Sequence, residues 1–309
     1  MTNATNPLSS RAVPHKLSPT LVALTAAVLG LLAPSCNDAA EPGAGASAGT
    51  PTGKVSPERA EALVAELVLA LEPVPATATS DVHDRAFTRA RKLREDLSRS
   101  GREVGLAALR AFQIRPDAPL DQQWPLLEVA AQNCPADLEP LLVKLVTTYD
   151  GERGMGLATQ AVRILAESSP QAAIALYEPM LRAPWEHKTK PAQEALVDGW
   201  ARAAKKLGLK DARILCDVLV DIRQPPDARY AAVNKLGEIG GDRAKAALKE
   251  VLLEASSDGL LRRKAAQVLV EVAPGKETCE LLLHVSGHES DPAFLTFLGS
   301  MLDKHCPGM

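Results

Sequence analysis

The sequence predicts an all-α protein, an α-α superhelix in which short helices stack in pairs. Part of the C-terminal half recurs after 33 residues, so that Arg229 and Ala232 return as Arg262 and Ala265. Apolar residues are spaced three and four apart, and no segment alternates apolar and polar residues as a half-buried strand does. The chain is 46% hydrophobic but only 3% aromatic. Its core must therefore be built from small aliphatic residues, which suit closely stacked helices.

The first 35 residues have the three parts of an export signal. Arg11 and Lys16 lie in a stretch without acidic residues, and an apolar run follows from Leu21 to Ala33. This run is shorter than the roughly 20 residues that span a bilayer, but it fits the core of a signal peptide. We therefore predict that residues 1–35 are a signal peptide. The alternative is a cytosolic chain whose apolar start arose by chance.

Cys36 follows small residues at the positions that a signal peptidase reads, and residues 36–55 form a predicted flexible tether rich in Ala, Gly, Ser, Pro and Thr. Together with the export signal, this pattern resembles a bacterial lipoprotein precursor. The resemblance implies that Cys36 is lipidated and anchors the mature chain to a membrane. Leu32 is one position further from the cysteine than usual, and Pro34 is atypical. Simple cleavage before Cys36, which would give a secreted soluble protein, stays open.

Three helices are predicted in an N-terminal helical segment, residues 56–118. Ser56 can cap the free N–H groups of the first helix, and Pro57 suits the first turn because its missing N–H would have no partner there. Prolines between this helix and the next interrupt the chain. The three helices are predicted to begin at Ser56, about Val82 and Gly101.

Residues 119–309 are predicted to form a repeat solenoid. The clearest repeats run from about Asp227 to Gly287. A final helix starts at Asp291 and Pro292, where Asp caps and Pro takes the first helical position. No second helix follows, so this half-repeat is predicted to cap the stack. The upstream helices are predicted at residues 126–132, 141–147, 157–167, 172–181, 193–207 and 212–220.

Two segments of these repeats resemble a known family. Residues 227–240 carry an arginine, paired alanines and then Leu-Gly-Glu-Ile-Gly, and residues 261–269 match the same pattern. They resemble HEAT-like repeats of the phycobilisome-lyase type. The resemblance implies a solenoid that binds proteins, although a few family members act on bilin chromophores. We do not carry that lyase activity over, because bilin attachment does not fit an exported lipoprotein.

The helix predicted from Val82 carries the strongest local charge bias of the chain. A basic strip runs beside its apolar face and could dock an acidic protein, a lipid headgroup or a cell-wall polymer. The other interpretation is a solvated face partly balanced by Glu95 and Asp96, which we favour because such runs are common on amphipathic helices. The basic strip consists of Arg85, Arg89, Lys92 and Arg99.

The histidines and cysteines predict no metal site. His284 and His288 have the spacing of two ligands on one helical face, but we expect Gly287 to end the helix between them. No two cysteines have zinc-type spacing. The 33-residue register brings Cys306 near the turn that leads into the helix of Cys279. A disulfide there could staple the C-terminal cap in an oxidising compartment, whereas buried free thiols are the default expectation.

No motif argues for catalysis, and we predict neither catalytic residues nor a cofactor. The glycine cluster of residues 151–156 lacks the strand-to-helix setting of a nucleotide loop, and we interpret it as a turn between helices. The net charge of −3 gives no general attraction to nucleic acid. We expect a non-enzymatic scaffold of the bacterial cell envelope that binds an unidentified protein and is held by Cys36. The alternatives are a HEAT-like enzyme using the solenoid groove, or polyanion docking through the basic strip.

Overall fold

The computed structural model divides the chain into two compact units, Met1–Thr52 and Gly53–Met309. The structure describes residues 55–148, 151–183, 192–254 and 257–307, all of which belong to the second unit. The predicted signal peptide, Cys36 and nearly all of the tether lie outside the described residues.

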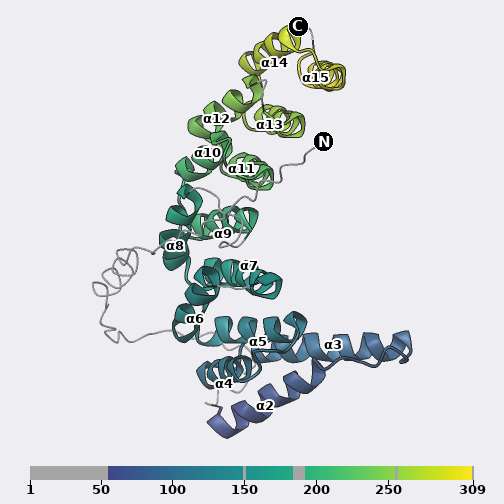
Figure 1. The fold of residues 1–309 in the computed structure, drawn as a ribbon, viewed down its shortest axis with the longest axis vertical. Coiled ribbons are helices and arrows are strands. Elements are labelled where there is room, and N and C mark those ends of the chain that lie inside the picture. Colours follow the sequence, from purple (N-terminus) through teal and green to yellow (C-terminus); the bar gives the residue numbers. More distant parts are fainter. Residues whose placement is uncertain (1–54, 149–150, 184–191, 255–256, 308–309) are drawn as a thin grey trace, which may run out of the picture. The chain divides into compact units, whose positions relative to one another are not determined.

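The described residues contain fourteen helices and no strand, which confirms the all-α prediction for this part of the chain (Figure 1). None of these helices has both the length and the apolar content that crossing a membrane requires. The helices are α2 (Pro57–Ala70), α3 (Ser80–Leu97), α4 (Arg102–Gln113), α5 (Leu120–Asn133), α6 (Pro135–Thr147), α7 (Gly151–Ser168), α8 (Pro170–Arg182), α9 (Gln193–Lys206), α10 (Arg213–Val220), α11 (Pro226–Ile239), α12 (Asp242–Leu253), α13 (Gly259–Val272), α14 (Lys276–His288) and α15 (Pro292–His305).

Neighbouring helices pack in pairs, and the pairs pack on one another. From α5 to α15 each odd-numbered helix contacts the next odd-numbered helix, which gives a row of side-by-side helices. The even-numbered helices from α6 to α14 each pack on the odd-numbered helix that follows (Figure 1). At the N-terminal end α2 packs on α4 and α4 packs on α5. This arrangement is that of a helical-repeat protein.

The core is built mainly from Ala, Val and Leu and continues from α2 to α15. The core is continuous across the predicted border between the N-terminal segment and the solenoid, which lies between residues 118 and 119. Close approach of α9 to α7 depends on Gly199, because a Cβ there would lie 2.5 Å from Cγ1 of Val162. Tyr177 of α8 spans the same junction, since its buried hydroxyl donates a 2.7 Å hydrogen bond to the Val162 carbonyl. Small residues thus set the helix spacing.

The recurring arginines of the repeat are buried caps. Nε of Arg229 donates to the carbonyl of Leu219 at 2.7 Å, and Nε of Arg262 donates to the carbonyl of Leu252 at 3.2 Å. These carbonyls lie in the last turns of α10 and α12, where helix carbonyls lack a partner in their own helix. Each arginine therefore joins the first turn of one repeat to the end of the repeat before it.

Several helix ends differ from the sequence prediction. α5 and α6 begin earlier than predicted and continue through Pro125 and Pro140. Each proline removes one helical hydrogen bond, but both lie only six residues into helices whose apolar faces are buried, and packing overrides the local propensity. The interpretation of residues 151–156 as a turn is wrong, because they form the start of α7. Gly287 does not end a helix either, since α14 continues to His288.

Candidate functional site

Helix α3 is the least buried long helix of the described structure. Only Leu97 is buried among its 18 residues. Its N-terminal half extends past the end of α5 (Figure 1), and two large apolar side chains stand in solvent there: Val82 is 39% exposed and Phe87 is 70% exposed. A helix with so little packing offers an open surface.

All four residues of the predicted basic strip lie on α3 or directly after it, and all are exposed. Arg85 contacts Asp81 one turn earlier at 2.6 Å. Within the described residues no ion pair joins Arg89, Lys92 or Arg99 to a carboxylate. Three cations of the strip are thus available to a partner.

A second cluster connects α3, α5 and α7. The Glu128 carboxylate pairs with Arg94 of α3 at 3.2 Å and with Arg163 of α7 at 2.7 Å. The Arg163 guanidinium lies 4.0 Å from the centre of the Trp124 ring, in cation–π geometry. We call these four residues the arginine–tryptophan cluster. Arg163 is 39% exposed at its side chain, so the cluster reaches the surface.

Sequence reasoning did not identify the arginine–tryptophan cluster. Glu128 and Arg163 stand 35 residues apart, whereas the clear repeats have a period of 33, so the two positions do not coincide in the register of the later repeats. A search for opposite charges one looser repeat apart would have paired them. Trp124 gives no periodic signal, because the chain has only three tryptophans.

Ion pairs continue along the odd-numbered helices beyond this cluster. Glu167 of α7 pairs with Lys206 of α9 at 3.0 Å, and hydrogen bonding from that lysine holds the pKa of Glu167 below its usual value. Asp198 of α9 pairs with Lys235 of α11 at 3.1 Å. Burial acts to raise the pKa of Asp198, but hydrogen bonds from Arg202 and Lys235 outweigh it and lower the pKa. The row thus presents fixed, ionised side chains.

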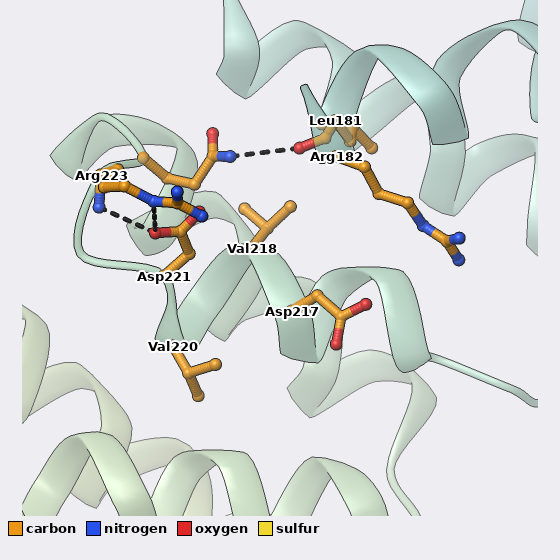
Figure 2. Close-up of a pocket in the computed structure, with 8 residues that line it drawn as sticks. Leu181, Arg182, Asp217, Val218, Val220, Asp221 and Arg223 are labelled. Atoms are coloured by element: carbon orange, nitrogen blue, oxygen red, sulfur yellow. Dashed lines mark hydrogen bonds and ion pairs between the residues drawn. The ribbon is translucent and has the colours of Figure 1, made fainter. Parts of the chain in front are cut away.

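An open cleft lies between the ends of α8 and α10 (Figure 2). Nε2 of Gln224 donates to the Leu181 carbonyl at 3.1 Å, so a glutamine caps α8 where arginines cap α10 and α12. Asp221 accepts hydrogen bonds from Arg223, which lower the pKa of its carboxyl. The described residues that line the cleft include no histidine, cysteine, serine or lysine. This chemistry offers charge and hydrogen bonding but no nucleophile paired with a base.

The cysteine pair of the C-terminal cap lies where the repeat register placed it. The sulfur atoms of Cys279 and Cys306 are bonded at 2.01 Å, which links the first turn of α14 to the residue after α15. Cys134 and Cys216 are free thiols. Burial raises the pKa of Cys134 to about 11, which makes it a poor nucleophile at neutral pH.

The two histidines lie on one continuous helix, whereas the sequence predicted that Gly287 would end the helix between them. Because α14 is continuous through Gly287, His284 and His288 lie on one face, with ring centroids 4.5 Å apart. The described residues contain no group of three or more potential metal-ligating side chains.

The chain has no detectable relative in three comparisons. No protein-family model matches it, no curated protein matches it, and no solved structure matches it. The resemblance to HEAT-like repeats consequently depends on the repeat residues themselves, together with the paired packing of the helices.

Proposed function

We propose that this protein is a non-enzymatic, HEAT-like scaffold of the bacterial cell envelope whose repeats form a superhelix and bind a partner protein. The arginine–tryptophan cluster is the observation that favours this function. Tryptophan and arginine dominate the binding energy of protein interfaces, and here two ion pairs and a ring contact fix both side chains in place. A surface held in place before binding loses less entropy on association.

Photo-crosslinking from the same face tests this proposal. Gln132 lies one turn after Glu128 on α5 and is exposed, so a photoreactive amino acid at this position would face the bound partner. We expect it to capture a defined protein in envelope extracts, and Trp124→Ala or Arg163→Ala to reduce the yield. The same amino acid at exposed Ala175 of α8 is the matched control. Equal capture from both positions would contradict the proposed site.

Anchoring through Cys36 is the second part of the proposal and needs its own experiment. Cell fractionation of the wild type and of Cys36→Ala should place the first with membranes and the second in the soluble fraction. A wild-type protein that stays soluble would refute the anchor. It would leave the protein-binding surface untouched, because a secreted protein could use the same surface.

A polyanion-docking function is the second candidate, and the exposed strip on α3 favours it. Arg85→Glu, Arg89→Glu and Lys92→Glu together should abolish binding to vesicles of anionic phospholipid, since each reversal replaces attraction with repulsion. Lys205, Lys210 and Lys304 are exposed lysines on other parts of the chain. Their combined reversal to Glu changes the net charge equally and should leave binding intact. Unchanged binding by the strip variant would exclude this candidate.

A further inference from the structure

The C-terminal end of α14 carries a histidine pair that the proposed scaffold function does not use. His284 and His288 are both exposed and stand one turn apart on a continuous helix. Their ring centroids are 4.5 Å apart and the planes are tilted by 43°. Two histidines four residues apart on one helical face are the arrangement by which a helix supplies two ligands to one metal ion.

A backbone contact selects the tautomer of one neutral ring. Nδ1 of His288 lies 2.8 Å from the carbonyl oxygen of His284. A carbonyl oxygen can only accept, so Nδ1 is the donor, and in the neutral ring this leaves Nε2 with a free lone pair. Metal-binding histidines almost always donate the non-ligating N–H to a carboxylate, a backbone carbonyl or water, and the His288 contact is of the second kind.

The C-terminal end of α14 favours a bound cation electrostatically. His284 and His288 lie in the last turns of α14, where the unpaired carbonyls carry partial negative charge and favour a cation. The carboxylates nearby are already engaged. Glu289 accepts hydrogen bonds from Arg262 and from the backbone N–H groups of Ser290 and Asp291, and Asp291 caps α15 through the N–H of Ala293.

We propose that His284 and His288 form a bidentate site for a divalent transition-metal ion, with water filling the remaining coordination positions. Two imidazoles suit Ni²⁺, Cu²⁺ and Zn²⁺ and give no basis for holding Mg²⁺ or Ca²⁺, which take oxygen ligands. With two protein ligands the site is weaker than a structural zinc site, which has four. Cu²⁺ binds most tightly and Ni²⁺ next, following the general order of divalent-metal affinities.

Titration calorimetry of the full chain with Ni²⁺ tests the site. Ni²⁺ is preferred as the probe because Cu²⁺ oxidises free thiols such as Cys134 and Cys216. We expect one ion per chain at this site. His284→Ala or His288→Ala should weaken binding at least about tenfold, because even loss of a group that only orients a ligand costs that much. Both side chains are exposed, so the variants retain the fold.

Two control variants separate the pair from histidines elsewhere. His83→Ala on α3 and His305→Ala on α15 remove other exposed histidines and should leave the affinity unchanged. Saturating Ni²⁺ should also raise the melting temperature of the wild type but not of the His284→Ala variant, because a ligand stabilises the state that binds it. Equal Ni²⁺ affinity in the wild type and the His284→Ala/His288→Ala double variant would overturn the proposal.

Discussion

The C-terminal repeats and the N-terminal helices use arginine in opposite ways. In the repeats α11–α14, Arg229 and Arg262 are each only 7% exposed and hold neighbouring units together through backbone carbonyls. On α3 and directly after it the arginines of the basic strip are exposed, and most of that helix lies outside the core. The same residue type is thus a structural cap where the period is strict and a surface charge where the period is absent. The comparison separates positions that stabilise the fold from positions that are free to bind.

Among changes to charged residues, the largest effect on the unfolding free energy is expected at Arg262. Its guanidinium caps Leu252, pairs with Glu289 at 2.5 Å and stacks over Phe294, and the two charged side chains are each 9% exposed. Arg262→Met keeps the volume but leaves a nearly buried carboxylate without its cation, which should cost about 3–5 kcal/mol of unfolding free energy in urea denaturation. Arg263→Met is the control. Its side chain is 33% exposed and lies 3.9 Å from Asp291, so the cost should stay below about 1 kcal/mol.

Loss of the Cys279–Cys306 disulfide should have the next largest effect on the unfolding free energy, because the bond links two residues 27 positions apart around the last two helices. Cys306→Ser should lower the unfolding free energy by about 2–4 kcal/mol when the protein is prepared under oxidising conditions. Cys216→Ser removes a free thiol and should have a smaller effect. If a reducing agent leaves the wild-type stability unchanged, the two thiols do not form this bond in solution.

Acid should weaken the same end of the molecule through Glu289. Hydrogen bonds from the backbone N–H groups of Asp291 and Ser290, followed by the contact with Arg262, lower the pKa of this carboxyl. A lowered folded-state pKa adds stability that is complete above the unfolded value, about 4.3, and is lost as the pH falls through the folded value. Glu289→Gln should therefore reduce the loss of stability on acidification to pH 3. Glu271→Gln, on the exposed side of α13, should show the acid sensitivity of the wild type.

The same contrast explains how much the sequence predicts. In α11–α15 the strict period allows three features to be predicted: the arginine positions, the helix end at Gly240 and the N-cap at Asp291. Each of them has a local physical cause that sequence patterns reveal. The starts of α5 and α6 were missed because proline lowers the local helix propensity while the buried apolar faces of both helices extend them. The start of α7 was missed because the glycine cluster of residues 151–156 is typical of a turn. Only packing across helices shows that Arg94, Glu128 and Arg163 meet, since their spacing follows no exact repeat. The extension of the N-terminal half of α3 past α5 likewise depends on where α5 ends, which the sequence of α3 does not show.

The smallest effect on stability is expected at Phe87, and it is also the most informative for function. Phe294 of α15 is fully buried, whereas Phe87 of α3 is 70% exposed. Phe294→Ala should cost about 3–5 kcal/mol, since it leaves a cavity in the core, while Phe87→Ala should change the unfolding free energy by no more than about 0.5 kcal/mol. A decrease of more than about 1 kcal/mol in the unfolding free energy of Phe87→Ala would mean that the N-terminal half of α3 packs on the rest of the chain and is not a free surface. A neutral result together with weaker partner capture would assign this exposed ring to binding, because a side chain that stabilises nothing in the free protein can then act only in the complex.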